Sequence, residues 1–131
     1  MNTVKSTRVL LVDDESLVRR VLRQILTQHS DVEVVGEAAT GDEAISAVEK
    51  SQPDVVLMDI RMPRMDGVTA AREIRAQHPH VKIIGLSEYA EGYQAHAMEL
   101  AGAVGTLMKS KATEELHEII KRVAAKESGT E

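Results

Sequence analysis

The sequence predicts an α/β domain built on a doubly wound parallel sheet, for two reasons. Five short apolar runs alternate along the chain with stretches in which apolar residues recur at helical spacing. Several of those runs are almost continuously apolar, which is typical of strands covered by helices on both faces. Because connections between parallel strands are right-handed, five such units are expected to wind helices onto both sides of one sheet.

The expected strands are residues 8–13, 32–38, 54–59, 81–87 and 104–109. The first, third and fourth are the most apolar, so we expect them at the centre of the sheet. The second contains Glu33 and the fifth contains Thr106, which favours places nearer the edges. The strand order 2-1-3-4-5 satisfies these preferences and gives a flavodoxin-like (βα)5 fold.

Helices are expected after each strand. The first carries an apolar stripe made of Leu17, Val18, Val21, Leu22, Ile25 and Leu26. The second begins at "TGDE" (40–43), which has the T-x-x-E form of a capping box. The third must end before Pro79, because the residue that precedes a proline disfavours helical dihedrals. A weaker helix is expected over 91–101, with Leu100 on its apolar face, and an amphipathic helix completes the domain.

A length of 131 residues suits one domain, which we place at 8–125 between an N-terminal extension (1–7) and a polar tail (126–131) expected to be disordered. There is no cysteine, which excludes disulfides and thiolate zinc sites and fits a reducing compartment. No apolar run is long enough to cross a bilayer, and the N-terminus lacks the apolar segment of a signal peptide. We therefore expect a cytoplasmic protein without membrane contact.

The charge and the aromatic content argue against direct binding of nucleic acid. The formal net charge is -5, and the basic residues are dispersed among acids rather than clustered. Phenylalanine and tryptophan are absent, so the chain has no aromatic platform on which bases would stack.

Several other side chains are expected at the surface. Arg19, Arg20 and Arg23 should form a solvated helix face. The six methionines are expected mostly to fill the aliphatic core, although Met62 and Met65 are candidates for exposure near the site described next, where they would touch a partner protein. The histidines share no metal-ligand spacing and are all expected at the surface; they are His29, His78, His80, His96 and His117.

Three aspartates are expected to meet at one edge of the sheet. Asp13 and Asp14 end the first strand, and Asp59 ends the third. Ligands of open parallel sheets bind outside the carboxyl ends of the strands, at the switch point between these two. Three like charges need a compensating cation, and an all-oxygen cluster favours a hard ion such as Mg²⁺. Since Mg²⁺ pairs with phosphate oxygens, a phosphate-containing ligand is the expected guest.

Two further strand ends supply groups that a phosphate would need. Ser87 offers a hydroxyl donor, and Lys109 offers a positive charge. Each type of residue alone has a simpler explanation, since Asp14 or Ser16 could cap a helix, a serine often forms a turn and a lysine is usually solvated. Chance is a much weaker explanation for all of these groups falling at carboxyl ends of strands. A carboxylate held beside a cation can also attack phosphorus and form an acyl phosphate.

Four segments resemble the receiver domain of two-component response regulators. They are "LLVDDE", "VVLMDIRMPRMDG", "IIGLS" and "AGAVGTLMK", and the resemblance covers about residues 7–124. The stretches "EVVGEAATGDEA" and "PDVVLMDIRMPRMDG" are most similar to receivers of regulators that carry a LuxR-type helix-turn-helix.

The resemblance implies that Asp59 is the phosphoacceptor. The donor would be a histidine kinase, a phosphotransfer protein or a small acyl phosphate. Mg²⁺ would be bound directly by Asp14, Asp59 and the backbone carbonyl of Arg61, with Asp13 acting through water. The domain would not be a multiple-turnover enzyme, but it would assist its own phosphoryl transfer and dephosphorylation.

The resemblance also assigns roles around the phosphoryl group. Lys109 would hold one phosphoryl oxygen and Ser87 another, while Pro63 and Gly67 would shape the loop behind the phosphoacceptor. Phosphorylation would then switch a protein-binding surface. The face made by the fourth helix, the fifth strand and the final helix is where receivers often pair, so it is the candidate for a homodimer contact.

Two positions depart from the family pattern. Thr106 stands where the family usually has Tyr or Phe, whose inward rotation relays phosphorylation, so we expect weaker switching or switching routed through Tyr89 or Tyr93. Glu88 stands where a small residue is usual, and a carboxylate pointing into the pocket would repel a phosphoryl dianion. Glu88, Tyr89 and Arg61 are therefore expected to tune the phosphorylation rate or the phosphoryl lifetime.

Three other functions compete with this hypothesis. A receiver-like interaction or oligomerisation module that acts without phosphorylation is favoured by Thr106 and Glu88 and opposed by the intact five-residue site. A metal-dependent phosphatase would carry a second aspartate where Arg61 stands. Nucleotide or flavin binding would require a Gly-rich or hydroxyl-rich loop after the first strand, and "DDES" is too acidic for that.

Overall fold

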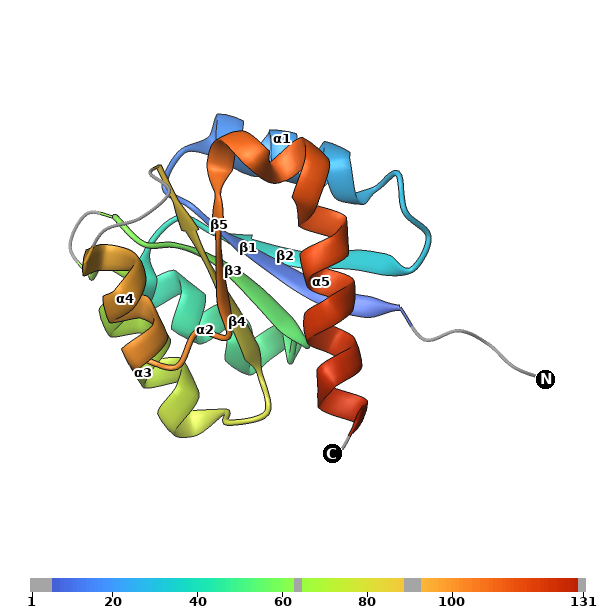
Figure 1. The fold of residues 1–131 in the computed structure, drawn as a ribbon. Helices are drawn as coiled ribbons and strands as arrows, with labels where there is room; N and C mark the ends of the chain where they lie inside the picture. The colour runs from blue at the N-terminus through green and yellow to red at the C-terminus, as the bar shows by residue number, and fades with distance from the viewer. Residues whose placement is uncertain (1–5, 63–64, 89–92, 130–131) are drawn as a thin grey trace.

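The computed structural model describes residues 6–62, 65–88 and 93–129, which contain a parallel five-stranded sheet (Figure 1). The strands are β1 (Thr7–Val12), β2 (Val32–Ala38), β3 (Val55–Asp59), β4 (Lys82–Ser87) and β5 (Gly105–Met108). Their order is β2-β1-β3-β4-β5, which confirms the prediction from apolar content. Because β3 is central and buried along its whole length, it delivers Asp59 to the middle of the carboxyl edge.

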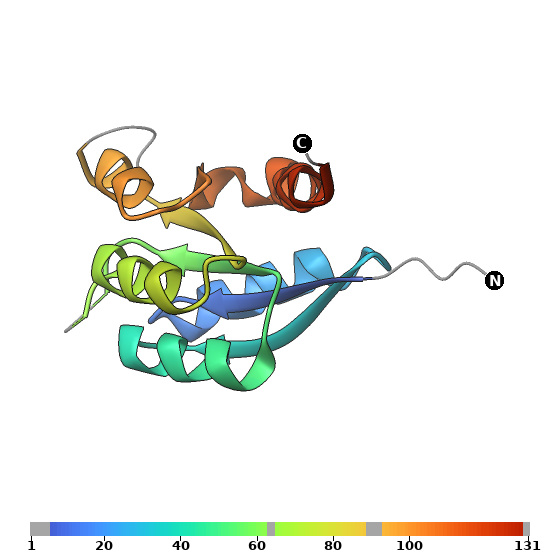
Figure 2. The same ribbon diagram turned by 90° about the horizontal axis from the view of Figure 1, so that it is seen from below.

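Helices cover both faces of the sheet. They are α1 (Ser16–Leu26), α2 (Gly41–Ser51), α3 (Gly67–Gln77), α4 (Tyr93–Leu100) and α5 (Ala112–Gly129), with a 3-10 turn, η1 (Lys109–Lys111), before α5. α1 and α5 pack on one face, and α2, α3 and α4 on the other (Figure 1 and Figure 2). Successive strand residues alternate between the two apolar layers: Leu57 belongs to the layer that includes Leu116 of α5, and Met58 to the layer that includes Ile74 of α3.

The predicted capping box starts α2. Thr40 Oγ1 accepts a hydrogen bond from the N–H of Glu43 at 3.1 Å, and Glu43 Oε1 accepts one from the N–H of Ala39 at 2.9 Å. α3 begins in a similar way, because Asp66 Oδ1 accepts a hydrogen bond from the N–H of Thr69 at 2.8 Å. Both helices therefore begin where a nearby side chain satisfies an otherwise unpaired backbone N–H.

Three apolar residues that were expected in the core are exposed. Leu17 and Val21 of α1 are 67% and 43% exposed, and Leu100 at the end of α4 is 75% exposed. The contact between α1 and the rest of the domain is narrower than the apolar face of this helix. Leu22 and Leu26 are therefore buried, while Leu17 and Val21 lie at the side of that face and stay exposed. The expectation of burial was wrong for these three residues.

The arginines of α1 do not form a purely solvated face. Arg19 Nε and Arg23 Nη2 lie 2.8 Å and 2.7 Å from the two carboxylate oxygens of Glu37 on β2. Arg19 Nη1 also donates to the carbonyl oxygen of Asp13 at 2.6 Å. Burial works against ionisation of Glu37, but the two guanidinium groups outweigh it and lower the pKa of this carboxyl. Of the three arginines, Arg20 is exposed as expected, whereas Arg19 and Arg23 tie α1 to β2.

The ends of the domain differ from the expected boundaries. β1 begins at Thr7, whose N–H donates to the carbonyl oxygen of Asp31 at 2.9 Å, so residue 7 belongs to the sheet. α5 continues to Gly129, so residues 126–129 are helical rather than part of a disordered tail. Within the described ranges, none of the helices combines the length and the apolar character needed to cross a membrane.

Gly67 allows α3 to begin close against the end of β3. Its N–H donates to the carbonyl oxygen of Ile60 at 2.9 Å. A β-carbon at this position would overlap the carbonyl oxygen of Asp59 and lie 2.8 Å from Cα of Ile60, and both are backbone atoms. The close approach therefore requires glycine, in agreement with the expectation that Gly67 shapes this loop. Pro63, which was expected to act with it, lies outside the described residues.

The substitution Gly67→Ala is expected to lower the free energy of unfolding by roughly 2–4 kcal/mol, because the backbone of β3 or α3 must shift to admit the methyl group. Urea denaturation measures this loss. The matched control is Gly105→Ala, whose β-carbon would meet Ile119 Cδ1 at 3.5 Å, an ordinary contact. Equal losses in the two variants would contradict the close approach.

Candidate functional site

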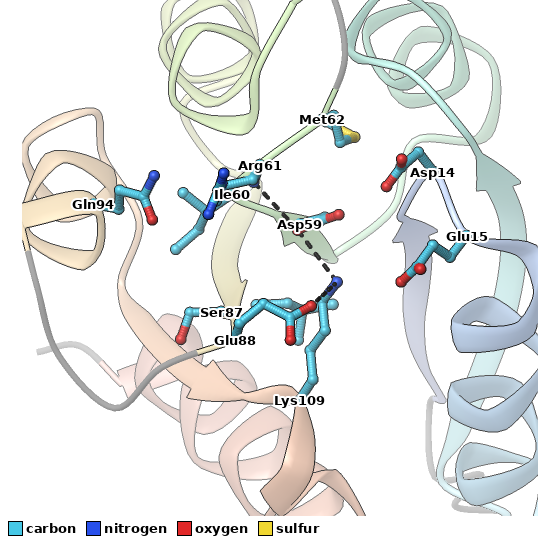
Figure 3. Close-up of a pocket in the computed structure, with 11 residues that line it drawn as sticks. Asp14, Glu15, Asp59, Ile60, Arg61, Met62, Ser87, Glu88, Gln94 and Lys109 are labelled. Atoms are coloured by element: carbon cyan, nitrogen blue, oxygen red, sulfur yellow. Dashed lines mark hydrogen bonds and ion pairs between the residues drawn. The ribbon is translucent and has the colours of Figure 1, made fainter.

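A pocket of about 400 Å³ opens at the carboxyl edge of the sheet (Figure 3). The end of β3 contributes Asp59, the end of β4 contributes Ser87, and η1 contributes Lys109 directly after β5. α4 reaches the pocket from the side through Gln94. The lining consists of Asp14, Glu15, Asp59, Ile60, Arg61, Met62, Leu86, Ser87, Glu88, Gln94 and Lys109.

Lys109 lies among the carboxylates of this edge. Its Nζ is 2.8 Å from Asp13 Oδ2, 3.4 Å from Asp59 Oδ1 and 3.6 Å from Glu88 Oε2 (Figure 3 shows the last two contacts). Burial disfavours the ammonium, but the hydrogen bond to Asp13 and the charges of Asp59 and Asp13 outweigh it, so the pKa of Lys109 is raised. Lys109 is therefore a fixed positive charge rather than a solvated lysine.

Three carboxylates gather where the sequence predicted them. One oxygen from each of Asp13, Asp14 and Asp59 lies within 4.8 Å of the other two. Asp13 Oδ1 accepts a hydrogen bond from the N–H of Glu15 at 2.9 Å, and Asp59 Oδ1 accepts one from the N–H of Arg61 at 3.2 Å. Asp14 is exposed, and α1 begins without a side-chain cap, so helix capping does not explain this aspartate.

The buried position of Asp59 makes its carboxyl group difficult to ionise. Burial first, and then the charge of Asp13, raises the pKa of Asp59 from an ordinary value of 3.8 to about 7. The opposing charge of Lys109 only moderates this rise. One ammonium group is therefore not enough to neutralise the two buried carboxylates beside it.

The acidic cluster fits a hard divalent cation. The donors are carboxylate oxygens, and no histidine of the described residues lines the pocket. Asp14 is open to solvent, so water could complete the coordination that Mg²⁺ prefers. A cation of this kind would also remove the repulsion that raises the pKa of Asp59.

The structure brings most of the predicted site residues to this edge. Ser87 is half-buried in the lining, and Glu88, which follows it, is exposed but within ion-pair distance of Lys109. Thr106 does not line the pocket; it pairs with Gly85 in the sheet and borders a separate cavity between β5 and α5. Tyr89 lies outside the described residues.

Sequence reasoning missed two polar lining residues, and it considered Met62 a candidate for exposure. Glu15 could have been found from its place directly after the two aspartates, whereas Gln94 comes from a helix that no motif linked to the site. Met62 is 8% exposed and belongs to the apolar layer beneath α2, α3 and α4, so it fills the core, as most of the methionines were expected to. Met65 is half-buried because it lies against the start of α2, where Gly41 leaves room for its side chain.

All five histidines were expected at the surface without a common site, but His29, His78 and His117 contact other side chains of the fold. His29 and His117 stack with ring centroids 3.6 Å apart. His78 Nε2 lies 3.0 Å from Glu49 Oε1. Among the described residues, His29 and His117 join Asp31 in a second group of potential metal ligands. Spacing could not predict this group, because its two histidines are far apart in the chain.

The substitution Asp59→Asn is expected to raise the free energy of unfolding by roughly 1–3 kcal/mol near pH 8 without divalent cations. The pKa of Asp59 is about 7 in the folded protein against an ordinary 3.8, so between these values the folded state holds a proton that the unfolded chain has lost. The stability lost by ionising Asp59 therefore grows as the pH rises from about 4 to about 7.

Urea denaturation of both proteins near pH 5 and near pH 8 measures this difference. Asparagine mimics the neutral carboxyl, so its stabilising effect should be clearly larger at the higher pH. The same gain at both pH values would contradict the raised pKa.

Three comparisons with known proteins agree with this architecture. A family model for the response regulator receiver domain matches residues 9–121. The chain is 39% identical over 122 residues to a Bacillus subtilis (strain 168) protein described as the uncharacterized transcriptional regulatory protein YxjL, covering 92% of this chain and 56% of that protein. The chain thus spans about half the length of the curated relatives it matches.

Solved structures give the same result. The signal receiver domain of NarL from Mycobacterium tuberculosis is 30% identical with a TM-score of 0.87, covering 93% of this chain and 98% of that one. The isolated REC domain of RcsB from Salmonella enterica serovar Typhimurium, solved with the phosphomimetic BeF3⁻, is 25% identical with a TM-score of 0.84, covering 93% and 91%. With the family model matching nearly its whole length, the chain belongs to the receiver domains of two-component response regulators.

Proposed function

We propose that this receiver domain accepts a phosphoryl group on Asp59 from a histidine kinase or a phosphotransfer protein. The position of Asp59 carries the proposal: its carboxylate ends a fully buried strand, lines a pocket and lies 3.4 Å from Lys109 Nζ. A rigid strand holds the nucleophile in place, and the pocket leaves room for the incoming group. The RcsB receiver, solved with the phosphomimetic BeF3⁻, supports the same chemistry.

In the proposed transfer, an oxygen of ionised Asp59 forms a bond to phosphorus while the bond from phosphorus to the donor breaks. With a phosphohistidine donor, the leaving nitrogen keeps the electron pair of the broken bond and takes a proton from solvent. Asp59 becomes an acyl phosphate. Because a protonated carboxyl is a poor nucleophile, the raised pKa of Asp59 makes loss of its proton a requirement for transfer.

The proposal includes Mg²⁺, held by Asp14, Asp59 and the backbone carbonyl of Arg61, with Asp13 acting through water. When bound, the ion supplies positive charge that offsets the carboxylates and the transferred phosphoryl group. The all-oxygen cluster of aspartates supports this choice of ion. Asp13 is buried and pairs with Lys109, which suits an indirect role better than direct coordination.

Lys109 and Ser87 would each hold a phosphoryl oxygen. The Lys109 ammonium would exchange part of its contact with Asp59 and Glu88 for a phosphoryl oxygen, and the Ser87 hydroxyl would donate a hydrogen bond. Thr106 has no ring to rotate, and its methyl group lies against the backbone of Gly85. We therefore propose that switching here is weaker than, or routed differently from, a relay by an aromatic side chain.

The proposed output is a change in the surface formed by α4, β5 and α5. Leu100 and Val104 are 75% and 50% exposed on this side of the domain, which suits an apolar contact with a partner or a second copy of the chain. Homodimerisation through this surface is part of the proposal. Direct contact between these residues and nucleic acid is not, because the net charge of -5 opposes it.

Treatment with Mg²⁺ and acetyl phosphate or phosphoramidate is expected to add one phosphoryl group to the wild-type protein and none to Asp59→Asn. Intact-protein mass spectrometry gives the result directly. The matched control is Asp54→Asn, because Asp54 precedes the same strand at its other end and its carboxylate accepts a hydrogen bond from the N–H of Arg8 at 2.9 Å. A folded wild-type protein that gained no mass from these donors or from a kinase would favour an interaction module that acts without phosphorylation.

The substitution Glu88→Gln is expected to speed phosphorylation by acetyl phosphate by about two- to tenfold. Glu88 places a carboxylate 3.6 Å from Lys109 Nζ, where it competes for the ammonium and repels an incoming dianion. Because Glu88 is largely exposed, added salt should shrink the difference. Glu99→Gln, an exposed position on α4, is the control, and unchanged kinetics in Glu88→Gln would end this explanation.

A further inference from the structure

Three potential metal ligands meet away from the acidic pocket. The rings of His29 and His117 are stacked, with centroids 3.6 Å apart and planes inclined by 7°. His117 Nε2 lies 2.9 Å from Asp31 Oδ1. One ligand atom from each of the three residues lies within 4.8 Å of the other two. The fold has therefore gathered two imidazoles and a carboxylate from segments that are distant in the sequence.

This group lies at the amino-terminal edge of the sheet, opposite the pocket. His29 and Asp31 belong to the loop between α1 and β2, and the Asp31 carbonyl accepts a hydrogen bond from the N–H of Thr7, the first residue of β1. His117 comes from α5 and crosses to this loop. None of the three residues lines the acidic pocket, so a ligand bound here would be independent of the proposed phosphoryl transfer.

The group is charged and open to solvent. The side chains of His117 and Asp31 are 30% and 25% exposed, which leaves a path for an ion from solvent. Lys121 is a charged neighbour of this group, because its Nζ lies 2.9 Å from Asp31 Oδ2.

We propose that His29, Asp31 and His117 bind a late first-row divalent metal ion, with Zn²⁺ as the reference ion. Two imidazole nitrogens and one carboxylate oxygen, with water in the fourth position, are a donor set that such ions take. Metal–ligand bonds of about 2.0–2.1 Å at tetrahedral angles place two ligand atoms about 3.3 Å apart. His117 Nε2 and Asp31 Oδ1 are now 2.9 Å apart, so they need to separate by only a few tenths of an ångström to admit the ion.

Two adjustments complete the site. The ion takes the place of the proton that His117 and Asp31 share, and the ring of His29 turns out of the stack to direct a nitrogen at the same ion. Lys121 opposes the ion, because its ammonium occupies the other oxygen of Asp31. Once bound, the ion joins α5 to the loop between α1 and β2, and it stabilises the folded chain by mass action.

The test is a titration of ZnCl2 into the full chain carrying Asp59→Asn, which removes one carboxylate from the acidic cluster. Calorimetry gives the affinity, and the ring resonances of the histidines locate the ion by NMR. We expect one Zn²⁺ per chain, with the large ring shifts confined to His29 and His117. Replacing either histidine by glutamine should weaken binding by about tenfold or more, since even the loss of an outer-shell group typically costs that much.

Two further variants separate a metal site from an ordinary ion pair. His96→Gln changes an exposed histidine of α4 outside the group and should leave the affinity unchanged. Lys121→Gln removes the competing ammonium and should tighten binding. The substitution His117→Gln keeps a hydrogen-bond donor for Asp31. If that variant still fails to fold, two other measurements test the proposal: the histidine ring shifts of the Asp59→Asn chain and the Zn²⁺ affinity of His29→Gln.

Two results would overturn the proposal. The first is equal Zn²⁺ affinity in His29→Gln and His96→Gln. The second is a titration in which the ring resonances of His29 and His117 stay in place, including one in which only signals of Asp13 and Asp14 move, because that ion would belong to the acidic pocket.

Discussion

The ion pairs that Lys109 forms with Asp13 and Asp59 are the interactions on which the carboxyl edge of the sheet depends. The two carboxylates end neighbouring central strands and are almost completely buried, so each would be costly to ionise alone. Lys109 reaches them from the far side of β4 and supplies one positive charge. The raised pKa of Asp59 indicates that one positive charge does not balance both carboxylates. A further cation, or a ligand that carries one, would therefore stabilise the ionised carboxylates at this edge.

Backbone constraints hold this arrangement in place. The close approach of Gly67 to the end of β3 leaves little freedom for the peptide that follows Asp59. On the neighbouring strand, the guanidinium of Arg19 binds the carbonyl oxygen of Asp13 and the carboxylate of Glu37, which links α1, β1 and β2. These contacts hold the backbone that carries the acidic side chains, while the pocket beside these side chains stays open. A fixed nucleophile beside an open pocket suits a reaction whose catalysis is mainly positioning.

α5 connects the two ends of the molecule. Lys109 stands in η1, directly before this helix, and His117 lies further along it, against the loop that contains His29 and Asp31. The acidic pocket and the proposed metal site therefore each involve a residue in or directly before α5, at opposite edges of the sheet. The exposed Leu17 and Val21 lie on α1, the helix that packs beside α5.

The sequence by itself determined the strand order and the placing of Asp59 and Lys109 at strand ends, because apolar content, helical period and capping are local properties of the chain. The tertiary structure decided which groups meet across segments. Three features depend on distances between segments that no spacing encodes: the pairing of Glu88 with Lys109, the raised pKa of Asp59, and the stack of His29 on His117 of α5. The exposure of Leu17 also depends on the tertiary structure, because the width of a helix's contact with the sheet depends on how its neighbours pack.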